Sequence, residues 1–361
     1  MTERQVRVLV VDDSAFMRRI ITDILTAGGC EVVGAARDGQ DALNKAAALR
    51  PDVVTLDVEM PVLDGYGTLR ELMTRQPLPV VMVSSLTKAG AEATVRALAL
   101  GAIDFLAKPS GAISLNMHTV AGELTAKVKA AATATPRFRR VVADLPELHR
   151  EKAVAAAGPL AETKPVPPRR LVVIGCSTGG PGALHQIMPH LPKELDAAVL
   201  VVQHMPAGFT RSLATRLDSI SAIRVREAQA GDTLEPGLAL IAPGGQHMLL
   251  AEDGRIALSE EPPLHGVRPA VDKLLLSVAA NWHSPCLGVI LTGMGHDGAR
   301  GMAALKKIGG ATIAEDASTC VVYGMPKAVV ELGLADAILP VHEIPAAIVR
   351  HTRAKQDEVR V

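Results

Sequence analysis

Short runs of consecutive apolar residues alternate with Ala/Leu-rich stretches of helical length along most of this chain. In the first third the apolar runs occupy residues 6–11, 30–35, 53–56, 80–83 and 104–107. Strands that read as unbroken apolar runs, rather than as alternating apolar and polar residues, belong to parallel sheets buried on both faces. The pattern therefore predicts a five-stranded, doubly wound α/β domain.

A second α/β pattern follows a segment of different character. From about residue 130 to residue 168 the chain is rich in Ala, Pro and charged residues, which predicts a semi-extended linker with one helical turn around residues 146–156. Further apolar runs occupy residues 171–174, 198–203, 239–241, 287–291 and 311–314. We predict two doubly wound parallel-sheet domains, residues 1–128 and 169–361, joined by a linker of residues 129–168.

The composition argues against several classes of protein. The 38 Lys and Arg residues balance the 38 Asp and Glu residues, so the chain lacks the basic excess that neutralises nucleic-acid phosphates. The cysteines are far apart and lie in or beside apolar runs, as reduced cytosolic thiols do. No signal peptide is visible, and no apolar run approaches the roughly 18 residues of a membrane span. We expect a cytoplasmic protein with no nucleic-acid partner and no direct membrane insertion.

Polar residues follow the predicted strands of the first domain. Asp12 and Asp13 end the first strand, Asp57 the third, Ser84 the fourth and Lys108 the fifth. Because the carboxyl ends of parallel strands meet at one edge of a sheet, we expect these side chains to converge. Close carboxylates repel one another without a divalent cation, and hard oxygen ligands suit Mg²⁺. Taken singly, either of the first two aspartates could instead be a helix N-cap.

The first domain resembles response-regulator receiver domains over about residues 4–127, through the segments Val-Val-Asp-Asp-Ser, Leu-Asp-Val-Glu-Met-Pro, Val-Ser-Ser and Ala-Lys-Pro. The resemblance implies a flavodoxin-like fold in which Asp57 accepts a phosphoryl group. The implied Mg²⁺ ligands are Asp12 (through water), Asp13, Asp57 and the Glu59 carbonyl, and the implied phosphoryl contacts are Ser84 and Lys108. Phe105 stands where receivers carry a rotamer-switching aromatic residue. Its ring has no hydroxyl, so packing alone would hold any outward state.

A glycine-flanked serine opens the second domain. The segment Gly-Cys-Ser-Thr-Gly-Gly, residues 175–180, follows an apolar run and precedes a helix-like stretch. Strand, G-x-S-x-G turn and helix are the layout of a nucleophile elbow, which predicts Ser177 as a nucleophile. Cys176 is the rival nucleophile, but the flanking glycines centre on Ser177.

A serine nucleophile needs a base, which an acid must orient. His204 follows the apolar run 198–203, and Asp297 follows the run 287–291, so both should lie at the same sheet edge as Ser177. Each of them alone could be a hydrogen-bonded structural residue. The chain order Ser–His–Asp also differs from the Ser–Asp–His order of α/β-hydrolases, which argues against an ordinary lipase or esterase fold.

Four segments of the second domain resemble the catalytic domain of the CheB methylesterase family over about residues 169–350. They are Gly-Cys-Ser-Thr-Gly-Gly, Val-Gln-His-Met-Pro, Ala-Pro-Gly-Gly-Gln-His and Leu-Thr-Gly-Met-Gly-His-Asp-Gly. The resemblance implies Ser177 as nucleophile, His204 as base, Asp297 as orienting acid and the Met294 N–H as oxyanion donor. His296 departs from the Asn that family members often carry before this Asp.

The same resemblance implies activity and partners. It implies a phosphorylation-activated protein-glutamate methylesterase and protein-glutamine deamidase, which needs no cofactor for the ester chemistry. Methyl-accepting chemoreceptors would be its substrates, and a chemotaxis histidine kinase would be its phosphodonor. We also expect the unphosphorylated receiver to cover the edge that bears Ser177, and phosphorylation of Asp57 to expose it.

Two other functions fit parts of the second domain. The spacing Gly293-x-Gly295-x-x-Gly298, with Glu315 and Asp316 about 20 positions on, matches a dinucleotide-binding fingerprint. However, it comes late in its domain and contains Asp297, whose charge would repel a diphosphate. A non-catalytic effector such as a DNA-binding module would need a basic recognition helix, whereas the domain offers glycine-rich loops at strand ends.

Overall fold

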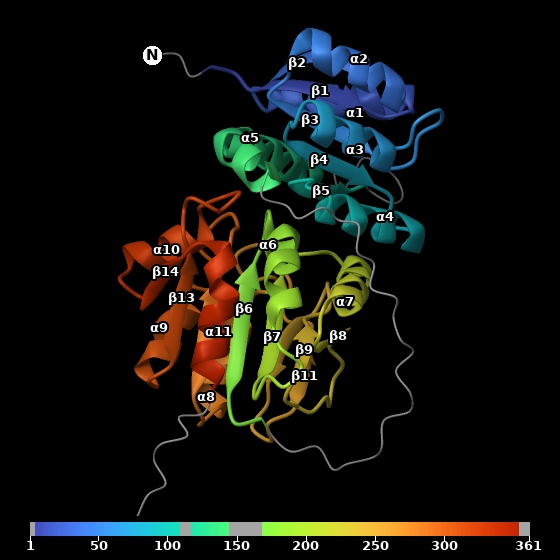
Figure 1. Cartoon of the computed structure of the whole chain (residues 1–361). Helices are drawn as coiled ribbons and strands as arrows, with labels where there is room; N and C mark the ends of the chain where they lie inside the picture. The colour runs from blue at the N-terminus through green and yellow to red at the C-terminus, as the bar shows by residue number, and fades with distance from the viewer. Residues whose placement is uncertain (1–3, 109–116, 144–167, 354–361) are drawn as a thin grey trace, which may run out of the picture. The chain divides into compact units, whose positions relative to one another are not determined.

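Each half of the chain is built on its own parallel sheet. Figure 1 shows the computed structural model, which describes residues 4–108, 117–143 and 168–353. The chain divides into two units, Met1–Leu148 and His149–Val361. The predicted fold class, two doubly wound α/β domains, is confirmed.

The first sheet has five parallel strands in the flavodoxin-like order β2-β1-β3-β4-β5. Helices α1 and α5 contact each other on one face, and α3 contacts α2 and α4 on the other (Figure 1). The strands are β1 (Arg7–Val11), β2 (Glu31–Ala36), β3 (Val53–Asp57), β4 (Val80–Ser84) and β5 (Asp104–Ala107). The helices are α1 (Ala15–Ala27), α2 (Gly39–Leu49), α3 (Gly65–Arg75), α4 (Lys88–Ala99) and α5 (Met117–Ala143).

Short polar side chains begin the helices of this unit. Backbone N–H groups in the first turns of α1 to α4 donate to the N-cap side chains Ser14, Asp38, Asp64 and Thr87. Asp12 is therefore not the N-cap of α1. The register pairs Val11 with Leu56 and Asp57 with Val83, which brings the carboxyl ends of β1, β3 and β4 to one level.

Helix α5 continues through Ala143, beyond residue 128, where we predict the first domain to end. It contacts α1 and the strands β3, β4 and β5, and Leu124, Val128 and Ala131 are fully buried. The Ala-rich segment after residue 129 is a strong helix former, so it extends the helix. Residues 144–167 of the predicted linker, with the helical turn expected at 146–156, lie outside the described residues.

Seven parallel strands form the second sheet, in the order β14-β13-β12-β6-β7-β9-β8. Its first strand, β6, lies between β7 and β12. The chain winds outward from β6 in both directions, and such a switch point is where open α/β sheets bind their ligands. The strands are β6 (Leu171–Cys176), β7 (Ala198–Gln203), β8 (Arg224–Glu227), β9 (Leu238–Ile241), β12 (Cys286–Ile290), β13 (Ala311–Glu315) and β14 (Ala337–Leu339).

Helices and one hairpin complete the second unit. The antiparallel hairpin of β10 (His247–Leu250) and β11 (Ile256–Ser259) stands outside the main sheet, and β10 packs against α8. The helices are α6 (Gly180–Ile187), η1 (Met188–His190), α7 (Phe209–Ile220), α8 (Val271–Asn281), α9 (Ala299–Lys307), α10 (Met325–Glu331), η2 (Val341–Glu343) and α11 (Ile344–Thr352). Every residue of β6, β7 and β12 is buried, so the core lies around the switch point.

Four strands of the second unit are absent from the sequence-based prediction. Strands β8 and β14 are the two edges of the sheet, and their residues are partly exposed. Strands at the edge of a sheet need no continuous apolar run when their side chains are only partly covered by the rest of the protein. Hairpin strands β10 and β11 belong to no parallel sheet, so the pattern that identifies buried parallel strands does not apply to them.

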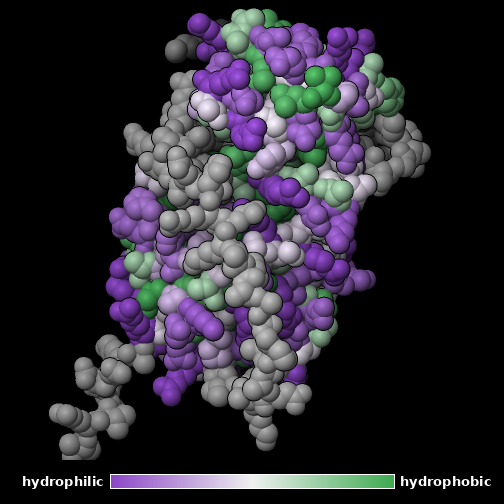
Figure 2. Space-filling view, turned by 45° about the vertical axis from the view of Figure 1, so that its right-hand side comes forward, coloured by the Kyte–Doolittle hydropathy of each residue, from purple (hydrophilic) through white to green (hydrophobic). Residues whose placement is uncertain are grey.

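The described surface is largely polar. Hydrophilic residues make up most of the coloured surface in Figure 2, and hydrophobic side chains form smaller patches between them. Exposed large hydrophobic side chains, such as Val62 and Leu332, come from separate elements of the two units. Within residues 4–108, 117–143 and 168–353, no helix combines the length and the apolar character that crossing a membrane requires.

Candidate active site

The glycine-flanked serine lies in a tight turn between β6 and α6. Ser177 follows the last residue of β6, and its N–H donates to the Thr292 carbonyl, beyond the end of β12, at 3.0 Å. A Cβ at Gly175 would lie 2.5 Å from Val271, and Gly179 has a φ of +81°, which L-residues avoid. The turn therefore requires Gly179, and the close approach of α8 to β6 requires Gly175.

The side chain of Gln203, at the end of β7, bridges the serine turn and the following loop. Its amide nitrogen donates to the carbonyls of Ser177 and His204, at 3.0 and 3.1 Å, and its Oε1 accepts from the Cys176 thiol at 3.0 Å. Gln203 is buried, and a Cβ at Gly180 would lie 2.1 Å from its Oε1. One buried amide thus sets the backbone spacing between Ser177 and His204.

The ring of His204 reaches the loop that follows β12. Its Nε2 lies 2.8 Å from Oδ2 of Asp297. Within the described part of the chain, neither Nδ1 of His204 nor the Ser177 hydroxyl has a hydrogen-bond partner. Catalytic hydrogen bonds are often long before substrate binds. The structure brings His204 and Asp297 together and leaves Nδ1 as the nitrogen available to Ser177.

The Asp297 carboxylate is held by the N-terminus of α8. Its Oδ2 accepts from the Val271 N–H at 2.7 Å, and its Oδ1 accepts from the Asp272 N–H at 2.9 Å. Burial raises the pKa of Asp297, but the hydrogen bonds from His204 and from these two N–H groups outweigh burial and hold the pKa below its ordinary value. Asp297 is therefore ionised at neutral pH and suited to stabilise a protonated His204.

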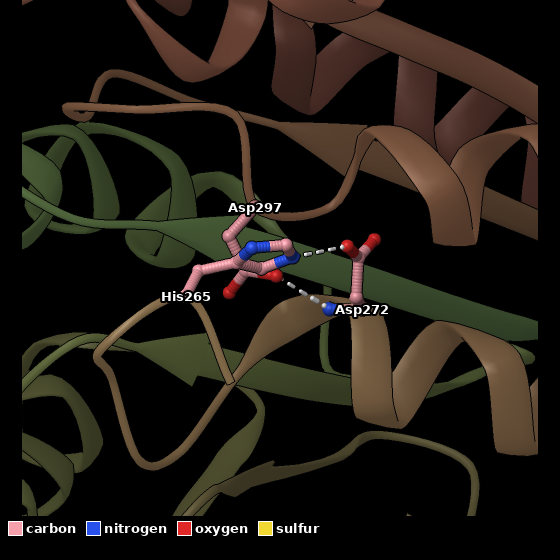
Figure 3. Close-up of side chains that lie close together, drawn as sticks. All are labelled: His265, Asp272 and Asp297. Carbon is pink, nitrogen blue, oxygen red and sulfur yellow. Dashed lines mark hydrogen bonds and ion pairs between the residues drawn. The ribbon is translucent and has the colours of Figure 1, made fainter. Parts of the chain in front are cut away.

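A second His–Asp pair lies beside the first. In Figure 3 His265 faces Asp272, with Nε2 3.0 Å from Oδ2, while Asp297 points to the Asp272 main chain. The other oxygen of the fully buried Asp272 accepts from the Gly301 N–H at 2.7 Å, which ties α8 to α9. The ligand atoms of His265, Asp272 and Asp297 lie within 4.8 Å of one another, a spacing compatible with a metal. Hydrogen bonds within the protein already account for this spacing.

The loop after β12 carries Met294, the predicted oxyanion donor. The N–H of the preceding Gly293 donates to Val322 at 3.0 Å, and the Gly293 carbonyl accepts from Gly324 at 3.1 Å. Among the described residues, no acceptor is found for the Met294 N–H. A Cβ at Gly293 would lie 2.7 Å from the Ser177 Cβ. The unpaired Met294 N–H therefore belongs to the residue directly after Gly293, which lies close to Ser177.

The alternative nucleophile and the alternative ligand both fit poorly. Cys176 is fully buried, and burial, with a smaller contribution from Glu315, raises the pKa of its thiol far above the ordinary value. A thiol must ionise to be nucleophilic, so Cys176 is inert. The G-x-G-x-x-G segment follows β12 rather than the first strand of its sheet. Asp297 lies within this segment, directly before the N-cap of α9, where its charge would repel a diphosphate.

In the first unit, three predicted acidic residues meet at the carboxyl ends of β1 and β3. One oxygen from each of Asp12, Asp13 and Asp57 lies within 4.8 Å of the others. Lys108 Nζ is 2.8 Å from Asp57 Oδ2 and 3.0 Å from Asp12 Oδ2. Three carboxylates against one ammonium leave surplus negative charge, and this all-oxygen donor set fits a hard divalent cation.

Charge and burial set the ionisation of this pocket. Burial raises the pKa of Asp57, and the charge of Asp12 adds to the rise, although Lys108 opposes it. Burial favours a lower pKa for Lys108, but its ion pairs with Asp57 and Asp12 outweigh burial and raise the pKa. Lys108 therefore stays charged and is placed to attract added negative charge at Asp57.

The other predicted residues of the pocket have contacts of their own. The Glu59 main chain hydrogen-bonds the Asp57 carboxyl and lowers its pKa. The buried Ser84 hydroxyl, at the end of β4, donates to the Gly90 carbonyl at 3.1 Å and must rotate to contact a phosphoryl group. Phe105 is buried in β5, with Lys127 Nζ 5.3 Å from its ring centroid, so its ring is in the inward position.

Comparison with known proteins assigns both units. A family model described as CheB methylesterase matches residues 172–348, and a response regulator receiver domain model matches residues 8–119. A protein of Symbiobacterium thermophilum, named protein-glutamate methylesterase/protein-glutamine glutaminase, is 66% identical over 352 residues, which cover 96% of this chain and 97% of that protein. The chain belongs to the CheB methylesterase family.

A second relative along nearly the whole chain agrees with this assignment. The Thermotoga maritima protein of the same name is 47% identical over 353 residues, which cover 97% of this chain and 99% of that protein. This chain is also similar to the crystal structure of the Thermotoga maritima CheB methylesterase catalytic domain. The sequence identity is 50%, the match covers 50% of this chain and 97% of the crystallised chain, and the TM-score is 0.49. The predicted resemblances to CheB and to receiver domains are confirmed.

Some residues of this CheB-family site escape the sequence analysis. Gln203 stands directly before His204 in the Val-Gln-His-Met-Pro segment, and a polar residue at the end of a buried strand is a usable signal. No local pattern marks His265 or Asp272, because their contacts depend on how α8 meets the loop after β12. Their positions follow only from the fold.

Proposed function

We propose that this chain is a serine hydrolase that removes methyl esters from glutamate side chains of methyl-accepting chemoreceptors and deamidates glutamine side chains. Relatives named protein-glutamate methylesterase/protein-glutamine glutaminase, similar along nearly the whole chain, support the proposal. The single observation that carries it is the His204–Asp297 pair, 2.8 Å apart, at the end of the strand beside the serine turn. Both reactions pass through one acyl-enzyme, so one site serves both.

Ser177 is the proposed nucleophile and His204 the proposed base. Nε2 of His204 is engaged by Asp297, so we assign Nδ1 to take the Ser177 proton as the oxygen attacks the γ-carbonyl. This is the reverse of the nitrogen order in chymotrypsin-type triads. The protonated His204 then donates to the departing methanol or ammonia. Water, activated by the same nitrogen, hydrolyses the acyl-enzyme.

The Met294 N–H is the proposed oxyanion donor. Both main-chain groups of the preceding residue, Gly293, are paired, its N–H with the Val322 carbonyl and its carbonyl with the Gly324 N–H. Because the donor is positioned before substrate binds, little reorganisation is needed when negative charge develops on the carbonyl oxygen. One such donor typically contributes about 10²–10³ in rate, and a well-placed base about 10²–10⁴.

Methanol release from methylated chemoreceptor tests the proposal. Ser177→Ala should reduce release to the background of the assay, since it removes the atom that forms the acyl-enzyme, and should leave the thermal transition unchanged. Cys176→Ser is the matched control, because it keeps a buried donor to Gln203, and it should retain activity. Near wild-type release from Ser177→Ala would show that the nucleophile is wrong.

We also propose that the receiver site holds Mg²⁺, with Asp12, Asp13, Asp57 and the Glu59 carbonyl as its ligands. The metal would supply positive charge that neutralises phosphoryl oxygens. Asp57 is the proposed phosphoryl acceptor, and Lys108, charged and 2.8 Å from it, would pair with an added phosphoryl oxygen. Ser84 would donate to a second oxygen once its hydroxyl leaves Gly90.

The partners and location follow from this chemistry. A chemotaxis histidine kinase is the proposed phosphodonor, and the cytoplasmic helices of chemoreceptors are the proposed substrate. We propose a cytoplasmic location, which the four buried free thiols favour. The domain boundaries, residues 1–128, 129–168 and 169–361, stay a proposal alongside the continuation of α5 to Ala143.

A further inference from the structure

Glu315, the last residue of β13, is a buried carboxyl group that the mechanism above does not use. Only 1% of its surface is exposed. Its Oε2 accepts from the Thr292 N–H at 2.8 Å, and its Oε1 accepts from the Thr319 hydroxyl at 3.0 Å. A carboxyl group in the core is costly when it is charged, so its presence and its contacts require a reason.

Thr292 connects Glu315 to the serine turn. The Thr292 carbonyl accepts from the Ser177 N–H at 3.0 Å. Its hydroxyl donates to the Thr178 carbonyl at 3.0 Å and accepts from the Val322 N–H at 2.9 Å. Thr292 therefore joins the loops that follow β6, β12 and β13, and it precedes the Gly293 turn. A shift of Thr292 would move both the proposed nucleophile and the proposed oxyanion donor.

Within the described part of the chain, no cation is found to offset the charge of this carboxyl group. The titratable groups that act on it or face it are Cys176 on β6, and Asp316 and Cys320 on the loop after β13. None of these described groups is basic. Burial is the largest cause that raises the pKa of Glu315, to about 7, and Asp316 adds to the rise against the hydrogen bonds from Thr292, Thr319 and Cys320.

We propose that Glu315 is a positioning residue for the acyl-transfer reaction and that its neutral form is the productive one. The inference rests on the proposed function of Ser177 and Met294. A neutral carboxyl group still accepts from the Thr292 N–H and so holds the turn. The ionised form keeps that hydrogen bond but adds a buried negative charge behind the loop that carries Met294. The proposed oxyanion of the substrate would develop beside this loop, and like charges in a low-dielectric interior repel.

Two substitutions, made in the whole chain, distinguish the effect of the hydrogen bond to Thr292 from the effect of the negative charge on Glu315. Glu315→Gln keeps an acceptor for Thr292 and cannot ionise, whereas Glu315→Leu removes the acceptor and leaves the Thr292 N–H unpaired. Methanol release is measured from pH 6 to pH 8.5 with saturating phosphodonor, and each variant is expressed as a ratio to wild type at the same pH. Glu331→Gln, the same change at an exposed site on α10, is the control with a flat ratio near one.

We expect the Glu315→Gln ratio to be near one at pH 6 and to rise to about three- to tenfold at pH 8.5, because only the wild type becomes charged. We expect kcat of Glu315→Leu to fall about 10²-fold at every pH, with KM little changed. A Glu315→Gln ratio that does not vary with pH, or a Glu315→Leu variant with wild-type kcat, would overturn the proposal.

Thermal unfolding gives a readout that does not depend on catalysis. The folded pKa of about 7 exceeds the ordinary 4.5, so the wild type loses stability as the pH rises through this window. The Tm of Glu315→Gln should equal that of wild type near pH 4.5 and exceed it by roughly 5–10 °C at pH 8.5. If Glu315→Gln shows the expected Tm difference but its activity ratio to wild type does not vary with pH, the positioning role is wrong and the proposed function still stands. Activity in Ser177→Ala overturns the proposed function instead.

Discussion

The amide of Gln203 donates to the carbonyls of Ser177 and His204, the two residues that we propose act on one substrate. Most buried polar side chains bond to the backbone of one neighbour, whereas this side chain spans two strand ends. Its Oε1 accepts from the Cys176 thiol, which fixes the orientation of the amide. The distance between the proposed nucleophile and the proposed base is therefore set by a residue that has no part in the proposed proton transfer.

Gln203→Glu should lower kcat by about 10²-fold and leave KM within about twofold, because a carboxylate cannot donate to either carbonyl and repels both. Methanol release from methylated receptor measures the change. Circular dichroism melts run alongside, and Cys176→Ser is the control that keeps the contact to Oε1. Equal reductions in Gln203→Glu and Cys176→Ser would assign the effect to packing rather than to the two donors.

Single residues were predictable where chemistry coincides with topology. Ser177, His204 and Asp297 each follow a buried apolar run, so the meeting of strand ends is enough to select them. The nitrogen of His204 that bonds to Asp297 was not predictable, because it depends on the side from which the β12 loop approaches the ring. Glu315 entered the sequence analysis only within a dinucleotide pattern, and its buried bond to Thr292 is a property of the fold.

At the scale of elements, the contact between α8 and α9 supports the acid of the site. The two helices pack closely at Gly301, where a Cβ would lie 2.3 Å from that of Leu275. The Gly301 N–H also donates to Asp272, whose own N–H holds Asp297. The position of the Asp297 carboxylate therefore depends on the distance between α8 and α9.

Gly301→Ala should destabilise the protein by about 1–3 kcal/mol, because the added methyl group forces α8 and α9 apart. It should also reduce activity more than the loss of stability explains. Gly182→Ala on α6 is the matched control. A Cβ there meets no atom within 4 Å, so the substitution should stabilise by about 0.4–1 kcal/mol. Urea unfolding measures both, and a neutral Gly301→Ala would show that the helices have room to move.

Elements were predictable in proportion to their burial. The strands at the centre of both sheets read as continuous apolar runs because both of their faces are covered. The edge strand β8, with the sequence Arg-Val-Arg-Glu, buries only one side chain fully and leaves no such run. Helix α5 continues into the segment predicted as a linker because the alanines after residue 129 also favour a helix.

At the scale of the whole molecule, a receiver and an esterase share one chain, and each has its own sheet and core. The two sites lie at the carboxyl ends of different sheets, so no residue needs to serve both. We predict that the receiver restrains the esterase until Asp57 is phosphorylated. This prediction comes from the family resemblance and from the acidic pocket, which contains the proposed phosphorylation site, Asp57.

A small phosphodonor with Mg²⁺ should raise methanol release by the whole chain, and Asp57→Asn should keep the basal rate without responding. A fragment of residues 168–361 should release methanol faster than the unphosphorylated whole chain. The comparison needs equal molar concentrations and the same receptor preparation. A fragment no faster than the whole chain would show that the receiver does not inhibit.

The N–H groups of Val271 and Asp272, which hold Asp297, belong to the main chain. Any residue except proline supplies the same N–H donor. These two hydrogen bonds to Asp297 therefore do not depend on which side chains occupy the two positions. Val271 is fully buried, so an alanine there would report the loss of packing, while the N–H that holds Asp297 would remain. The most dependable part of this site is therefore invisible to mutational mapping, and replacing the peptide bond before Val271 with an ester would reveal it.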